Sequence, residues 1–194
     1  FAGTRLVREP ASGEWGSYPE GFAVLGDVVL FAAWDPLHGV ELWRSDGTEA
    51  GTTLLRDLNP NGDGAPAELT VPRLVDYRDG RLAYFTADDG VYPRQLWRTD
   101  GTEEGTFPIS QYFRWGNGAP RLLTVMDGEL YFRGGYNGSR VVPWHASPTG
   151  IEAVNYATDR RREPGCFLPE DMVALGNQLL FSCRDFEHGQ ELWA

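Results

Sequence analysis

Short runs in which apolar and polar residues alternate cover most of the chain, and Gly, Asp and Pro separate them. This two-residue period is typical of half-buried β-strands. No segment keeps the 3.6-residue apolar period, with caps at its ends, that an amphipathic helix requires. Four strands are predicted in the first group, over residues 22–25, 28–32, 40–44 and 52–56. The pattern therefore predicts an all-β protein with little helix.

Two-residue turn signals connect the first two strands of each group. They contain Gly with Asp or Asn, the residues that adopt positive φ in tight β-hairpins. The four dipeptides are Gly26-Asp27, Asp79-Gly80, Asp127-Gly128 and Gly176-Asn177. Each group is therefore expected to begin with an antiparallel hairpin.

One motif repeats through the chain. Residues 40–52 read VELWRSDGTEAGT and residues 94–106 read RQLWRTDGTEEGT, whereas a degenerate third copy keeps only Trp144 and Gly150. The fourth copy ends in Glu191, Leu192 and Trp193. The tryptophans are 54, 47 and 49 residues apart, a period typical of solenoids, propellers and linear arrays.

Four-stranded antiparallel units repeated around an axis are the blades of a β-propeller. We therefore predict one domain, residues 1–194, with four blades over residues 22–56, 74–110, 122–154 and 172–193 plus 3–8. Residues 3–7 align with 51–55, so pairing of the N- and C-terminal segments would close the ring and remove exposed sheet edges. The alternative is four consecutive repeats from a longer propeller or array.

The motif resembles that of the ELWxxDGT-repeat proteins, a poorly characterised family of exported bacterial proteins. The likeness covers the two full copies, residues 35–39 and 185–189, and the segment 57–60. The third unit departs from it at residues 142–144 and 147–149. The resemblance implies a propeller-like fold and a location in the periplasm, at the cell surface or outside the cell, and it transfers no catalytic residue.

Charge and hydropathy exclude some partners. The chain has 17 basic and 28 acidic residues and a net charge of −11, which repels nucleic acids and anionic membranes. The longest apolar run, residues 28–34, is far shorter than the roughly 20 residues of a membrane helix, so no transmembrane segment is expected. Because the chain starts at Phe1 rather than Met, we expect that a leader was removed or the sequence trimmed.

The only two cysteines, Cys166 and Cys183, lie in the same repeat unit, in a loop and in the strand that follows it. A disulfide between them would suit an exported protein. The alternative is two unrelated buried thiols, because sequence spacing does not supply the geometry of the bond.

The repeated residues themselves are interpreted as structural. One Trp per unit at a fixed register fills the space between adjacent sheets. Asp46-Gly47 and Asp100-Gly101 are interpreted as turns in which the Asp accepts local N–H bonds and the Gly takes positive φ.

A calcium site is one hypothesis for residues 57–68. The spacing of oxygen donors matches a twelve-residue calcium loop, with Asp57, Asn59, Asn61 and Glu68 as ligands of Ca²⁺. The flanking segments are strands rather than helices, and two prolines stiffen the loop, so the alternative is an ordinary connection between blades.

His38 and His188 occupy equivalent places in the first and fourth units, which would be neighbours in a closed ring. With Glu41 and Glu191 they could form a zinc site. The alternative is that each His-Gly belongs to a hairpin turn, which is how the same pair occurs in the family.

No catalytic signature is present. The sequence has no G-x-S-x-G elbow, phosphate-binding loop or dinucleotide fingerprint, and no pair of carboxylates stands out as a glycosidase pair. We therefore expect the protein not to be an enzyme.

Binding is expected where the repeat breaks down. Residues 107–118 concentrate aromatic side chains with Arg and Asn, which are enriched at binding surfaces. The candidate binding residues are Tyr112, Phe113, Arg114, Trp115, Tyr136 and Arg140. The alternative is that Phe113 and Trp115 only cap the core.

The expected function is a non-enzymatic, exported binding or scaffolding module that holds a protein partner, or a larger complex, through its inter-blade loops. A carbohydrate-binding, lectin-like propeller whose aromatic residues 112–115 stack on a glycan is the alternative, and a glycan hydrolase is a third possibility.

Overall fold

The computed structural model describes residues 3–11, 16–70, 82–92, 94–110, 119–136, 140–147, 150–154, 167–185 and 187–194. All regular secondary structure in these residues is β-strand, so the prediction of an all-β protein is confirmed. The described part of the chain contains no helix long and apolar enough to cross a membrane.

The strands form four antiparallel sheets, each in sequence order. The first contains β1 (Glu20–Leu25), β2 (Val28–Asp35), β3 (Gly39–Ser45) and β4 (Thr53–Arg56). The second contains β5 (Ala67–Thr70), β6 (Ala83–Ala87), β7 (Gln95–Thr99) and β8 (Phe107–Pro108). The third contains β9 (Arg121–Met126), β10 (Glu129–Tyr136), β11 (Arg140–Ser147) and β12 (Gly150–Ala153). The fourth contains β13 (Phe167–Leu175), β14 (Gln178–Asp185) and β15 (Gly189–Trp193).

These meanders correspond to the predicted repeat units. Each has the strand order of a propeller blade, and the predicted hairpin turns at 26–27, 127–128 and 176–177 are present. Residues 71–81 lie outside the described residues. They contain the predicted start of the second unit and the remaining hairpin signal, Asp79-Gly80.

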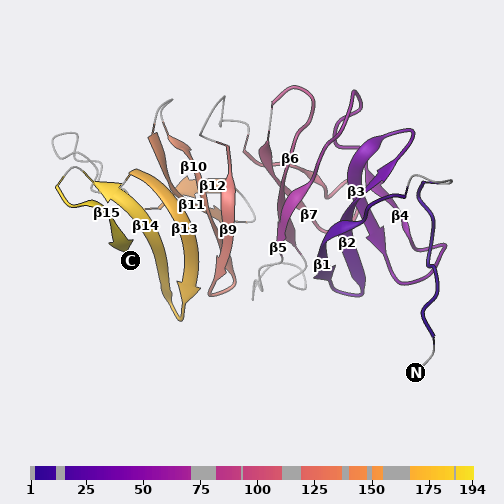
Figure 1. Cartoon of the computed structure of the whole chain (residues 1–194), viewed down its shortest axis with the longest axis horizontal. Helices are drawn as coiled ribbons and strands as arrows, with labels where there is room; N and C mark the ends of the chain where they lie inside the picture. The colour runs from indigo at the N-terminus through magenta and orange to yellow at the C-terminus, as the bar shows by residue number, and fades with distance from the viewer. Residues whose placement is uncertain are drawn as a thin grey trace.

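The predicted closure of the ring is wrong. Figure 1 shows the four sheets in a row, with the N-terminus beside the first sheet and the C-terminus beside the fourth. The segment expected to pair with the fourth sheet instead lies against the first: Arg5 donates to the carbonyl of Gly47 at 3.1 Å and Arg8 to that of Glu49 at 3.4 Å. The turn after β3 supplies carbonyl acceptors for these guanidinium groups, whereas β15 lies at the far end of the row.

Every sheet has two different faces, and unlike faces of successive sheets pack against each other. One, here called the leucine face, carries Leu30 and Leu42 in the first sheet, and it packs against Phe85 and Trp97 of the second. The opposite face, here called the Phe–Trp face, carries a directly paired Phe and Trp in each sheet: Phe31 and Trp43, Phe85 and Trp97, Phe132 and Trp144, and Phe181 and Trp193.

The second interface repeats the first. Tyr84 and Leu96, in the register of Leu30 and Leu42, pack with Phe132, and Trp144 packs against the same cluster. Each buried leucine or phenylalanine contributes roughly 1.5–3 kcal/mol. The prediction that tryptophans fill the space between sheets is confirmed at Trp97 and Trp144.

The DGT turns are held by side-chain hydrogen bonds. Asp46 Oδ1 accepts hydrogen bonds from the backbone N–H of Thr48 at 2.8 Å and from its hydroxyl at 2.7 Å. Asp100 and Thr102 repeat this pair at 2.9 and 2.7 Å. A Cβ at Gly51 would collide with the Asp46 carboxylate, which explains the second glycine of the motif. The structural interpretation of these turns is confirmed.

The two ends of the row are covered differently. Phe22 of β1 stacks on Phe31 of β2 with ring centroids 5.6 Å apart, so it extends the Phe–Trp face of the first sheet, in which Phe31 and Trp43 are buried. The leucine face of the fourth sheet has no such cover among the described residues: Leu192 is 73% exposed, whereas Leu42 and Leu96, at the same register, are 0% exposed.

This contrast predicts the stability of two matched variants. Leu42→Ala should lower the free energy of unfolding by about 2–5 kcal/mol, because it leaves a cavity between two sheets. Leu192→Ala, the same change at the exposed copy, should alter it by less than about 0.5 kcal/mol. Urea titration followed by tryptophan fluorescence measures both, and equal losses would contradict the stacking described here.

Candidate functional site

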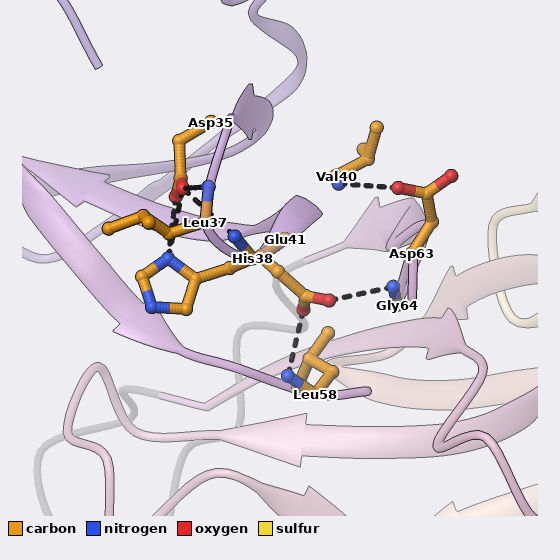
Figure 2. Close-up of polar contacts among 8 residues, drawn as sticks. All are labelled: Asp35, Leu37, His38, Val40, Glu41, Leu58, Asp63 and Gly64. Carbon is orange, nitrogen blue, oxygen red and sulfur yellow. Dashed lines mark hydrogen bonds and ion pairs between the residues drawn. The ribbon is translucent and has the colours of Figure 1, made fainter. Parts of the chain in front are cut away.

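The turn between β2 and β3 is organised by one carboxylate. Asp35 Oδ1 accepts the backbone N–H groups of Leu37 at 2.8 Å and His38 at 3.0 Å, and Asp35 Oδ2 lies 2.9 Å from Nδ1 of His38 (Figure 2). Burial alone would raise the pKa of Asp35, but the hydrogen bonds from His38 and the two N–H groups outweigh it and lower the pKa. The same bond to Asp35 raises the pKa of the His38 imidazole. The pair is therefore favoured in its charged form.

An equivalent turn occurs in the fourth sheet. His188 donates its backbone N–H to Asp185 at 2.6 Å, and its Nδ1 lies 2.8 Å from Oδ2 of the same carboxylate. Its hydrogen bond to Asp185 raises the pKa of His188. This recurrence supports the interpretation of Asp-x-x-His as a turn device.

The hypothesis that His38 and His188 share a zinc site is wrong. His38 and His188 lie in the first and fourth sheets, at opposite ends of the row, so they are not neighbours (Figure 1). Each imidazole is instead paired with the Asp of its own turn.

Next to the turn between β2 and β3, a buried glutamate binds the loop that connects the first sheet to the second. Glu41, 0% exposed, accepts the backbone N–H of Leu58 at 2.8 Å and that of Gly64 at 2.7 Å, one with each carboxylate oxygen (Figure 2). Asp63 Oδ1 accepts the N–H of Val40 at 2.9 Å in return. Loop 57–65 is thus tied to the start of β3 from both sides.

Burial decides the charge of this glutamate. Removal from water raises the pKa of Glu41 to about 7, against the hydrogen bonds from Leu58 and Gly64 that lower it, and the negative charge of Asp57 raises it further. The carboxyl group is therefore poised between its neutral and charged forms near neutral pH.

The anchor differs in the second sheet. Gln95 stands in the register of Glu41 and is also buried. The hydroxyl of Ser110 accepts the backbone N–H of Leu96 there, at 2.6 Å. The glutamate and its loop are therefore a device of the first interface. Glu41 was noted in the sequence only as a zinc ligand, because nothing in the motif indicates that it points into a loop.

The candidate calcium ligands do not converge. Asn59 donates to the carbonyl of Asp63 at 3.0 Å and accepts the N–H of Asn61 at 3.2 Å. Glu68 reaches instead toward the third sheet, where it accepts the N–H of Leu123 at 3.4 Å. Within the described ranges no group of three or more His, Cys, Asp and Glu side chains is placed to hold a metal. The calcium hypothesis gains no support from Asp57, Asn59, Asn61 and Glu68.

The structure describes only two of the six predicted binding residues. Tyr112, Phe113, Arg114 and Trp115 lie outside the described residues. Tyr136 and Arg140 pair at the end of the β10–β11 hairpin, and their part in binding stays a prediction.

The predicted disulfide between Cys166 and Cys183 also stays a prediction. Cys183 is fully buried and is not a free thiol. Cys166 lies outside the described residues, so its pairing with Cys183 stays a prediction.

The pocket of greatest interest was not foreseen from the sequence. A pocket of about 550 Å³ opens where β2 ends and β3 begins, and the residues that line it are Ser17, Tyr18, Glu20, Trp34 and Val40. The signal that could have indicated it is Trp34, which lies outside the repeated Leu-Trp register. A second pocket, of about 540 Å³, lies between residues 5–10 and the first sheet.

Comparison with known proteins indicates the fold alone. The chain matches no protein-family model, and no curated protein matches it. It is similar to the crystal structure of a puromycin hydrolase mutant complexed with PGG, at 15% identity and a TM-score of 0.55 over 90% of this chain. It is also similar to a Bacteroides ovatus GH43B protein of a xyloglucan PUL, at 11% identity and a TM-score of 0.38, again over 90% of this chain. The chain spans only 26% and 37% of the lengths of these two proteins.

The buried glutamate predicts how stability depends on pH. The folded state holds the Glu41 proton up to about pH 7, whereas the unfolded chain releases it near 4.5. The contribution of Glu41 is therefore fully present below pH 4.5 and is lost as the pH rises to about 7. It amounts to about 3 kcal/mol.

Glu41→Gln isolates this effect, because the amide does not titrate and the other groups cancel in the comparison. The difference in unfolding free energy, wild type minus variant, should fall by that amount between the two pH values in denaturant titrations. Parallel pH profiles for the two proteins would contradict the assignment.

Proposed function

We propose that this protein is a non-enzymatic module that binds other protein chains through the exposed faces of its end sheets. The observation that carries the proposal is the contrast between Leu192, 73% exposed, and Leu42 and Leu96, each 0% exposed at the same register. A leucine face is covered by the next sheet inside the chain, and the fourth sheet presents the same kind of face to solvent.

The exposed face is continuous. Val173 pairs directly with Leu180 across β13 and β14, and Leu175 pairs with Gln178, so these side chains share one face of the sheet. Leu192 pairs with Ser182 on the same face. Val173 and Leu175 are exposed as well. A cluster of exposed apolar side chains on one sheet face is typical of an interaction surface.

The other end of the row is also apolar. Leu6, Phe22 and Val24 are exposed there, and Phe22 stacks on the Phe–Trp face of the first sheet. Phe31 and Trp43 of this face are buried, at 7% and 5% exposure, so the aromatic surface at this end is provided by the exposed Phe22.

The partner that this arrangement favours is a second copy of the chain, docked head to tail. Such an interface joins two different surfaces, so each copy keeps one free end after a contact forms. It would place the leucine face of one copy against the exposed Phe22 of the next, in the same direction as the stacking between the first three sheets. This geometry is our reason for proposing a role as a scaffold that builds larger assemblies.

The other hypotheses have less support. The Asp35–His38 pair resembles the orienting half of a catalytic triad, but its repetition at Asp185 and His188 favours a turn role. A lectin-like role through residues 112–115, and an exported location, remain predictions from the sequence. Cys183 is consistent with export, since it is not a free thiol.

Two complementary variants test the proposal. Leu192→Glu places a charge on the leucine face of the fourth sheet, and Phe22→Glu places one on the opposite end. In sedimentation velocity from about 1 µM to about 1 mM, the wild type should associate with rising concentration and each variant alone should stay monomeric. An equimolar mixture should form a dimer, because each variant retains the end that the other has lost.

Salt provides an independent readout. Each copy carries a net charge of −11, so association should strengthen between about 0.05 and 0.5 M NaCl as the repulsion is screened. A wild type that stays monomeric throughout, or a mixture that fails to restore the dimer, would contradict the head-to-tail assembly. Leu37→Ala, which changes an exposed apolar residue in the turn between β2 and β3, is the matched control.

A further inference from the structure

The unforeseen pocket beside β2 and β3 has aromatic and acidic walls. It is lined by Tyr18 and Trp34 together with Glu20, Ser17 and Val40. Its volume of about 550 Å³ is within the range of small-molecule sites. Among the lining residues that the structure describes, Glu20 is the one charged side chain.

The tryptophan of this pocket is not required by the repeat. Trp34 pairs with Val40, one position before the end of the hairpin. At the same register the third sheet pairs Gly135 with Val141 and the fourth pairs Arg184 with Gln190. Because these sheets form with a glycine or a charged residue at this position, the repeat does not account for the large half-buried side chain of Trp34.

Tyr18, another residue of the pocket wall, has an unfavourable backbone conformation. Tyr18 has φ of 46°, a left-handed value unusual for an aromatic residue, and its side chain is 71% exposed. The neighbouring carbonyl of Ser17 accepts the backbone N–H of Trp34 at 2.8 Å, which fixes this segment beside the tryptophan. Left-handed conformations of this kind are concentrated at ligand-binding sites.

The chemistry of the walls favours a cation. The faces of Trp and Tyr rings attract positive charge, and an adjacent carboxylate adds to the attraction. A neutral sugar would require several hydrogen-bonding groups, and the polar side chains among the described lining residues are those of Ser17, Tyr18 and Glu20. The 194 residues include no lysine, so none of their side chains could supply an alkylammonium group to this pocket.

We propose that the pocket formed by Tyr18, Trp34 and Glu20 binds an organic ammonium cation, with its alkyl groups against the two rings and its charge beside the carboxylate. This site is separate from the end faces that mediate assembly, and its function does not depend on them.

Titration calorimetry with choline, and with its neutral carbon analogue 3,3-dimethylbutanol, tests the charge requirement. Choline should bind at least about tenfold more tightly than the neutral analogue, because only choline gains the cation–π attraction. Equal affinity for the two probes, or no heat from choline up to about 10 mM, would overturn the proposal.

Variants locate the site. Trp34→Ala should weaken choline binding about tenfold, and Glu20→Gln, which removes an exposed charge, about threefold. Leu37→Ala is the matched control, an exposed apolar side chain in the adjoining turn, and should leave binding unchanged.

Two further variants keep the test decisive. If Trp34→Ala fails to fold by circular dichroism, Tyr18→Ala removes the exposed wall instead and should also weaken binding several-fold. Leu192→Glu should bind choline like the wild type, which separates this site from the assembly faces. Retained affinity in a folded Trp34→Ala or Tyr18→Ala variant would overturn the assignment.

Discussion

Burial of two unlike apolar faces on every sheet is the constraint from which the rest of the structure follows. A four-stranded meander with a leucine face and a Phe–Trp face cannot cover both by itself, so the inner faces of the row are buried against neighbouring sheets. The leucine face of the first sheet meets Phe85 and Trp97, and that of the second meets Phe132. Because the two faces differ, the stack has a direction. Its two ends are therefore chemically different, and the proposed head-to-tail assembly is based on that difference.

The connection between the first two sheets shows how polar groups are accommodated in this stack. Two backbone N–H groups of loop 57–65 would be buried without partners, and Glu41 accepts them both. The desolvation that raises the pKa of this carboxyl to about 7 is the cost of that arrangement. The loop is thereby held to β3, next to the pocket walls formed by Trp34 and Val40. Glu41 thus holds the loop to the same strand that carries Val40 of the pocket.

Departures from the repeat were more informative about binding than the repeat itself. Trp43 and Trp97 recur at a fixed register and are buried between or against sheets, whereas Trp34 occurs once, at a position that other sheets fill with Gly135 or Arg184. The sequence prediction instead favoured residues 112–115, which lie outside the described residues. It overlooked the pocket because Tyr18 and Trp34 come together only through pairing of the chain before β1 with β2.

The sequence by itself determined the local structure. Alternation specified the strands, Gly-Asp and Asp-Gly signals specified hairpins, and the DGT motif specified turns in which Asp46 caps Thr48, because all of these depend on residues close together in the chain. Whether the row of sheets closes, where the N-terminal segment lies, and which donors converge were decided only by tertiary contacts. Residues 3–7 match a last strand in pattern, yet Arg5 binds the turn at Gly47. Glu68 matches a calcium ligand in spacing, yet it reaches Leu123 in another sheet. The alternation of apolar and polar residues indicates which face of its sheet a side chain occupies. Which residues that side chain contacts is decided only when the sheets pack together.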